Sequence, residues 1–303
     1  MATAGQASIA LEDANRFVRP DSESFQQRRF RVYSYSLSSC KPDPICKSQT
    51  STFYNLEKVW LNGSTYFGNA TGYDWVVNSG EVIATNNGTK LILNETNGGT
   101  KISSTRYIHY GKIDFVLETS KWAGVVTAAI TMSDVKDEID WEFPGNNTLA
   151  AQTNFWFLGI ANYSATKGRS VGVSSATSSN FHTYTEDRLA TRDTNVADRW
   201  ERRANALQEP DPLIEWHAVI QISIWPAGLN TSAQGTINWA GGLIDWQDSD
   251  YLSNGFFWNT LQSVTVTCAD ETNVTSGTTG WVYTGIGAGN VPVVVLTNAS
   301  TLL

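Results

Sequence analysis

Apolar and polar residues alternate along several short segments of this chain. Such a period of two places apolar side chains on one face and polar side chains on the other, as in a half-buried β-strand. Turn-forming Gly, Asn and Ser separate the segments, and no long 3.6-residue period stands between them, which excludes alternating strand–helix units. The pattern predicts an all-β fold of antiparallel sheets with strands at 90–96, 106–120, 123–133, 152–159, 219–225 and 263–268.

The same alternation predicts which side chains form the core. Within a strand, every second side chain belongs to one face, and the apolar face is expected to be buried. The predicted core residues of two segments are Ile113, Phe115 and Leu117 in 106–120, and Ile220, Ile222 and Ile224 in 219–225.

The chain divides into three regions. Residues 1–39 have no periodicity and many charges, so a disordered N-terminal extension is expected. Residues 40–272 carry the predicted strands and form one domain. The Ser/Thr/Gly-containing residues 273–303 are expected to be a C-terminal tail, with one last strand possible in VPVVVLTNASTLL (291–303). Inside the domain, the densely charged segment 186–209 has almost no β-branched residues and is expected to be a helix or a solvated loop.

Composition narrows the class of partner. The net charge of −8 leaves no basic stripe to neutralise phosphates, so no nucleic-acid partner is expected. No apolar run reaches the ~18 residues of a membrane-spanning helix, so no transmembrane segment is expected. Aromatic residues make up 12% of the chain, with Trp at 12 positions, which suits a sugar-binding cleft or a large β core.

The stretch DEIDWEFPG, residues 137–145, alternates acids with large apolar residues. As a strand, it places Glu138, Asp140 and Glu142 on one face and the apolar side chains in the core. Glycosidases use a pair of carboxyl groups, one ionised and one protonated, and a third carboxylate can raise the pKa of its neighbour by like-charge repulsion. Strand spacing alone does not choose between the retaining and the inverting geometry.

Two other interpretations of the three acids are open at this point. An acidic strand facing solvent is one, although exposed acids seldom alternate with Trp and Phe. A calcium site is the other, since carboxylates suit this cation, but no Asn/Asp-rich loop surrounds the motif. We expect catalysis, with no metal and no cofactor.

Several further motifs accompany the acids, and together they resemble one family. SSTRYIHYGK (103–112), AGVVTAAITMSDVKDEIDWEFPG (123–145), QTNFW (152–156), FHTYT (181–185) and SIWPAG…AQGTINWAGG (223–242) are similar to glycoside hydrolase family 16, and more narrowly to its fungal Crh-type cell-wall transglycosylases. The resemblance runs from about Cys40 to Cys268. It implies a concanavalin-like β-jelly-roll sandwich of two antiparallel sheets with a concave substrate cleft.

The resemblance also implies a retaining mechanism on fungal cell-wall polysaccharide. Glu138 would be the nucleophile, Asp140 the assisting carboxylate and Glu142 the general acid and base. Family members transfer chitin oligosaccharide to β-glucan or chitin acceptors, so these polysaccharides are the expected partners. The alternatives are a β-glucan hydrolase and a catalytically impaired, lectin-like wall protein. A monomer is expected.

Six further residues are candidates for substrate binding. Trp225 lies opposite the predicted core face of its strand, and Trp239 is at the matching position of the family; exposed Trp stacks well on a pyranose ring. Core packing is the competing interpretation for both tryptophans, and a structural role competes for the other four. The candidates are Trp225, Trp239, Gln152, Asn154, His182 and Tyr184.

The cysteines and sequons bear on the compartment. Cys40 and Cys46 flank a short Pro-containing loop that is expected to close as a disulfide in an oxidising compartment, and Cys268 is expected to be a buried free thiol. A secreted wall protein is expected, with neither its signal peptide nor its lipid-anchor signal in this chain. Asn-X-Ser/Thr sequons, which occur partly by chance, stand at Asn62, Asn69, Asn87, Asn94, Asn146, Asn162, Asn230, Asn273 and Asn298.

The segment 186–209 departs from the family. After FHTYT the family continues with a Trp-containing strand, a turn and another strand that line the donor side of the cleft. Here the charged segment takes that place, and Trp200 is its only aromatic residue. Loss of this hairpin is expected to leave an open sheet edge and a weaker donor site.

Overall fold

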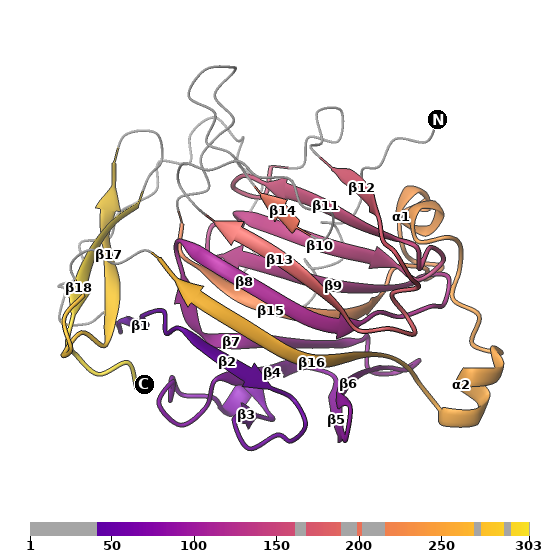
Figure 1. Ribbon diagram of the computed structural model, residues 1–303, viewed down its shortest axis with the longest axis horizontal. Helices are drawn as coiled ribbons and strands as arrows, with labels where there is room; N and C mark the ends of the chain where they lie inside the picture. Colours follow the sequence, from indigo (N-terminus) through magenta and orange to yellow (C-terminus); the bar gives the residue numbers. More distant parts are fainter. Residues whose placement is uncertain are drawn as a thin grey trace.

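The computed structural model describes residues 41–160, 168–188, 199–201, 216–269, 274–287 and 292–302. Two large sheets pack face to face as a sandwich, and a third, small sheet stands at one end (Figure 1). The predicted all-β class is therefore confirmed. The predictions for residues 1–39 and for Cys40 concern residues that lie outside the described part of the chain.

The first layer is an eight-stranded sheet. Its strands are antiparallel to their neighbours except for the parallel pair β3–β4 at one edge. Their order is β12 (Arg169–Gly172), β11 (Ala150–Trp156), β10 (Glu138–Pro144), β9 (Val125–Ser133), β15 (Ala218–Pro226), β7 (Thr100–Ile108), β4 (Trp75–Ser79) and β3 (Val59–Trp60).

The second layer is a seven-stranded sheet, again antiparallel except for the edge pair β13–β14. A short strand, β2 (Gln49–Thr52), pairs with β16 beside the main path. The order of the others is β14 (Arg199–Glu201), β13 (His182–Arg188), β8 (Gly111–Glu118), β16 (Phe257–Cys268), β6 (Gly88–Leu93) and β5 (Glu81–Thr85).

The core lies between the two layers. The predicted core faces are confirmed: the alternate residues of β8 and β15 that were expected inside are at most 2% exposed. On β10, Ile139, Trp141 and Phe143 are at most 3% exposed and join the same cluster. Two short helices, α1 (Gln234–Trp239) and α2 (Ser249–Asn254), and a 3₁₀ turn, η3 (Gly63–Thr65), complete the described part.

One predicted strand is in fact two. The segment 106–120 contains the end of β7 and the whole of β8, which lie in different sheets. The chain turns between them at His109 and Tyr110, and Gly111 follows with φ 140°, a conformation that side chains disfavour. The buried positions change parity at this turn, from Ile108 to Gly111 and Ile113, and the sequence prediction overlooked this change.

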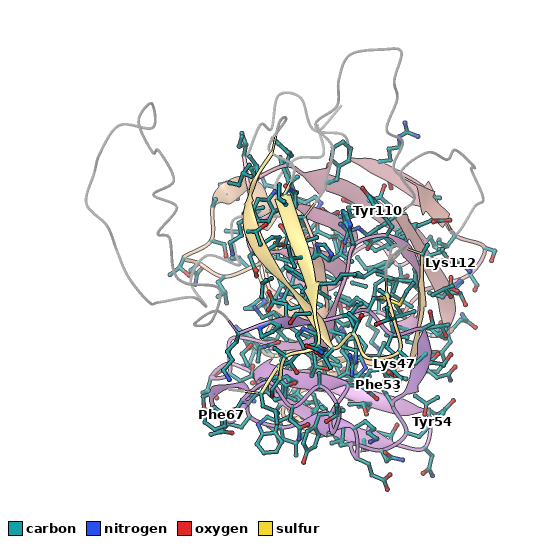
Figure 2. The ribbon with its side chains drawn as sticks, turned by 90° about the vertical axis from the view of Figure 1, so that its left-hand side faces the viewer. Lys47, Phe53, Tyr54, Phe67, Tyr110 and Lys112 are labelled. Atoms are coloured by element: carbon teal, nitrogen blue, oxygen red, sulfur yellow. A yellow bond between two sulfur atoms is a disulfide. The ribbon has the colours of Figure 1, made fainter. Side chains whose placement is uncertain are left out.

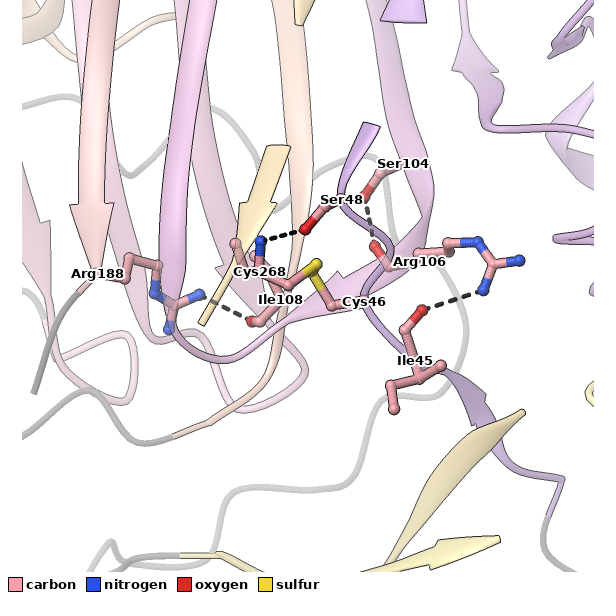
Figure 3. Close-up of a disulfide and its surroundings, with 8 residues drawn as sticks. All are labelled: Ile45, Cys46, Ser48, Ser104, Arg106, Ile108, Arg188 and Cys268. Atoms are coloured by element: carbon pink, nitrogen blue, oxygen red, sulfur yellow. Dashed lines mark hydrogen bonds between the residues drawn. A yellow bond between two sulfur atoms is a disulfide. The ribbon is translucent and has the colours of Figure 1, made fainter. Parts of the chain in front are cut away.

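The prediction of a helix or loop for 186–209 is wrong where the structure describes this segment. Residues 186–188 end β13, and residues 199–201 form β14. The side chains of Glu186 and Arg188 are buried because each has polar partners. The Arg188 guanidinium donates to the carbonyl of Ile108 at 3.1 Å (Figure 3) and to that of Trp216 at 3.1 Å. Glu186 accepts from the Thr131 hydroxyl at 2.6 Å.

The last strand expected in VPVVVLTNASTLL is present as β18 (Pro292–Thr297), whereas the prediction of a tail is wrong for the strand before it, β17 (Gly280–Ile286). The two strands form a hairpin that pairs with β1 (Asp43–Pro44) as the third sheet. The hairpin stands at the end of the sandwich that Figure 2 faces. It is fixed by Trp281, which is fully buried and stacks on His217 with ring centroids 4.1 Å apart.

The disulfide links Cys46 to Cys268, not Cys40 to Cys46 (Figure 3). Strand pairing explains it: β2 runs antiparallel to β16 with Gln49 opposite Val266, which brings Cys46 beside Cys268. Cys268 is therefore neither free nor fully buried, and the prediction of a buried thiol is wrong.

Among the described helices, none is long and apolar enough to cross a bilayer.

Candidate active site

The three acids of β10 lie together on one face, as predicted from the alternation. β10 is an inner strand of the eight-stranded sheet, between β9 and β11. Glu138, Asp140 and Glu142 are 8%, 1% and 7% exposed. Their apolar neighbours along the strand are anchored in the core, so the backbone that carries the carboxyl groups is held in place.

The neighbouring strands bring two predicted residues to the acids. Gln152 of β11 lies directly across from Glu142, and Asn154 lies across from Asp140. Paired positions on adjacent strands project from the same face of the sheet. Gln152 and Asn154 therefore belong to the face that carries the acids.

The two candidate tryptophans meet on the same face. Trp225 belongs to β15, two strands from β10, and Trp239 is the last residue of α1. Their rings stack with centroids 6.0 Å apart and planes at 24°. The Trp239 indole N–H also donates to the Gln152 side-chain oxygen at 2.8 Å. Because this stacking leaves Trp225 only 8% exposed, the half-buried Trp239 is the more accessible ring.

His182 and Tyr184 are not part of this face. Both lie on β13 in the seven-stranded sheet. Tyr184 is fully buried between the sheets, with its ring 4.6 Å from Phe143 and 5.6 Å from Trp141, so the prediction that it binds substrate is wrong. His182 is hydrogen-bonded with the Ser175 hydroxyl at 3.1 Å, on the opposite sheet from the acids. Alternation assigns a side chain to a face, but it does not say in which sheet the strand lies.

Burial is the largest cause of the raised pKa values of the three carboxyl groups. It raises the pKa of Glu138 to about 7, and the charge of Lys136 partly offsets this rise. Burial, followed by the charge of Glu138, raises the pKa of Glu142 well above its usual value. Asp140 has its pKa raised by burial and then by its two acidic neighbours, against a hydrogen bond from the Asn154 backbone.

Lys136 is a candidate functional residue that sequence reasoning missed, because its charge lowers the pKa of Glu138. It lies in the turn between β9 and β10, two residues before Glu138. Its φ of 70° is left-handed, and its backbone is fixed by hydrogen bonds to Ser133 at 3.0 Å and from Gly159 at 2.8 Å. The spacing V-K-D-E in the sequence was the available signal, since a lysine so close to the first acid can stabilise its ionised form.

The arrangement suits acid–base and nucleophilic chemistry. Two buried glutamates on one strand face can take the two roles that carboxyl-pair enzymes require, one ionised and one protonated. Within the part of the chain that the structure describes, no three His, Cys, Asp or Glu side chains are arranged to hold a metal ion.

Comparison with known proteins gives the family. The model of glycosyl hydrolases family 16 matches residues 69–241, which include the three acids, Gln152 and both tryptophans. The chain belongs to glycosyl hydrolases family 16. The resemblance inferred from the sequence motifs is thereby confirmed.

Individual relatives of this family 16 chain are Crh-like proteins. It is 37% identical over 264 residues to Congo red hypersensitive protein 2 of Saccharomyces cerevisiae, covering 83% of this chain and 56% of the relative. It is 34% identical over 282 residues to Crh-like protein 3 of Botryotinia fuckeliana, covering 89% and 62%. The chain thus spans little more than half the length of these curated relatives.

A solved structure shares the fold. The structure of Crh5 transglycosylase in complex with NAG matches with a TM-score of 0.64 and 23% sequence identity, over 80% of this chain and 90% of that one. This likeness confirms the sandwich architecture of the family 16 chain. The sequence pattern did not predict the small third sheet.

Proposed function

We propose that this family 16 chain is a retaining transglycosylase that acts on cell-wall polysaccharide. The observation that carries the proposal is the placement of three buried carboxyl groups, those of Glu138, Asp140 and Glu142, on one face of β10. Burial raises the pKa of Glu138 to about 7, and burial together with the charge of Glu138 raises the pKa of Glu142. A retaining enzyme needs this pair, one ionised as nucleophile and one protonated as acid.

The proposed reaction has two steps. The Glu138 carboxylate attacks the anomeric carbon and forms an ester bond to the sugar, while the glycosidic C–O bond breaks and the leaving oxygen takes the proton of Glu142. A hydroxyl of the acceptor sugar then gives its proton to Glu142 and attacks the same carbon, which releases Glu138. The charge of Glu138 disfavours ionisation of Glu142 by like-charge repulsion, and Asp140 lies between the two glutamates on the strand.

The proposed donor is a chitin oligosaccharide and the proposed acceptor a β-glucan or chitin chain. Support comes from the Crh-like relatives and from the transglycosylase of similar fold that was solved with NAG. Trp239 is the proposed stacking platform for a sugar ring, with Trp225 behind it and Asn154 as a further contact. The disulfide favours an oxidising compartment, and we propose a secreted, monomeric wall protein.

The test is transfer of chitin oligosaccharide to a fluorescent glucan acceptor. The wild type should form longer labelled products, and Glu138→Gln should form none while it unfolds at the same temperature as the wild type. Glu81→Gln is the matched control, since Glu81 is exposed on β5 of the other sheet and should be fully active. Products that only shorten would favour a β-glucan hydrolase. Binding with no product of any length would favour a lectin-like protein.

A further inference from the structure

Lys101 lies on the same face of the sheet as the acids. It is part of β7, and its two neighbours along the strand point the other way. The Thr100 hydroxyl donates to the Ile92 carbonyl of the seven-stranded sheet at 2.6 Å, and Ile102 is 1% exposed in the core. Because side chains alternate, the Lys101 side chain projects from the opposite face, where the carboxyl groups lie.

Strand register places Lys101 in line with Glu142. Glu142 pairs with Ala128, Ala128 with Ser223, and Ser223 with Lys101. The line crosses three interstrand spacings of ~4.8 Å, roughly 14 Å on a flat sheet. The two residues between the ends have small side chains, so nothing bulky in this line separates the acid from the lysine. A single sugar ring is too short to reach from one to the other, whereas an oligosaccharide lying across the strands can do so.

The Lys101 ammonium is held partly out of water without a counter-charge. Within the described residues, neither of the ion pairs involves Lys101. Burial lowers its pKa, and the like charge of Lys136 lowers it further. Lys101 is only half-buried, and its ammonium is not among the buried groups that lack a partner, so a bound oxygen acceptor can replace water at its donors.

We propose that Lys101 forms a distal sugar subsite in which its ammonium donates to the acetamido carbonyl of an N-acetylglucosamine unit. This inference rests on the proposed function. In a neutral chitin chain the amide carbonyl is the strongest acceptor, and hydrogen bonds to a charged donor are stronger than those between neutral groups. A deacetylated unit carries an ammonium of its own and is repelled. The subsite therefore selects acetylated chains.

The experiment measures oligosaccharide binding by calorimetry in the inactive Glu138→Gln background. Lys101→Met keeps the aliphatic stem and removes the charge. The Kd of the N-acetylglucosamine hexasaccharide should rise about tenfold or more, and that of the disaccharide should stay the same. The preference for the acetylated over the deacetylated hexasaccharide should shrink in Lys101→Met. Lys112→Met is the control, since Lys112 is paired with Asp114 at 2.7 Å on the other sheet.

These binding measurements test the Lys101 subsite independently of the proposed transglycosylase activity. An unchanged hexasaccharide Kd in Lys101→Met, an equal loss for both lengths, or no binding of either oligosaccharide would overturn it. If binding depends on Lys101 but the wild type transfers no sugar, the subsite stands and the proposed transglycosylase activity fails.

Discussion

The indole N–H of Trp239 donates a 2.8 Å hydrogen bond to the side-chain oxygen of Gln152. This bond joins the end of α1 to β11, and Gln152 is the cross-strand partner of Glu142. It holds the aromatic ring beside the strand pair that carries the proposed acid. The expectation that the Gln152 amide donates to a sugar hydroxyl stays a prediction, because this bond uses only the side-chain oxygen; we expect Gln152 also to position Trp239.

Gln152→Leu should release the ring. We expect the KM for oligosaccharide to rise about tenfold, because one hydrogen bond and a fixed stacking surface are lost. The change in kcat should be smaller. Gln234→Leu is the control, because it removes a 2.8 Å amide hydrogen bond to Asn238 on the same helix but away from Gln152. Equal KM values for Gln152→Leu and the control would contradict the positioning role.

Lys136 should set the acid limb of the pH profile. Its charge stabilises the ionised form of Glu138 and so lowers the pKa of that carboxyl. Replacing Lys136 removes this effect, the pKa rises, and the acid limb of kcat/KM moves to higher pH. Lys136→Asn is the suitable change, because Asn tolerates the left-handed φ of 70° at this position. The difference from the wild type should shrink at ~1 M salt, which screens exposed charges. An identical acid limb would rule out this role.

Glu186 should make the protein less stable as pH rises. Burial raises its pKa from 4.5 to about 7, and Arg188 and the Thr131 hydrogen bond offset part of this rise. Between these values the unfolded chain loses the proton that the folded protein keeps. Stability is therefore full below pH ~4.5 and declines until pH ~7, by up to about 3 kcal/mol.

Glu186→Gln tests this dependence by urea unfolding between pH 4.5 and 8. The variant keeps an acceptor for Thr131 but has no proton to lose, so it should be more stable than the wild type at pH 8 and similar at pH 4.5. Arg188 retains its two carbonyl acceptors in the variant. The carboxyl groups of β10 titrate in both proteins, so only the difference between them reports on Glu186. Parallel pH curves would contradict the assignment.

The disulfide should contribute strongly to stability. Cys46 and Cys268 are 222 residues apart in sequence, so the bond restricts most of the unfolded domain. Cys268→Ser should lower the free energy of unfolding by about 2–5 kcal/mol. Cys40→Ser should change neither the stability nor the Cys46–Cys268 peptide found by mass spectrometry. A Cys40–Cys46 peptide instead would restore the pairing expected from the sequence.

The sequence by itself determined the local half of the site. In 137–145 the period of two is enough to place Glu138, Asp140 and Glu142 on one face and to bury Trp141, because side-chain direction depends only on the residue's place in the strand. The same rule identified the isoleucine face of β15 and put Trp225 on the opposite face of that strand. The family motifs then supplied Trp239, which no strand period could place.

Tertiary structure decided everything that depends on which strands meet. FHTYT alternates correctly, yet β13 lies in the opposite sheet, so Tyr184 became core. Pairing of β2 with β16 gave Cys268 a partner far away in sequence. Trp281 fixed a hairpin where composition suggested a tail. Lys101 came into line with Glu142 only through the register of β9, β15 and β7. Such contacts join residues distant in sequence, and alternation within one segment carries no information about its neighbours in space.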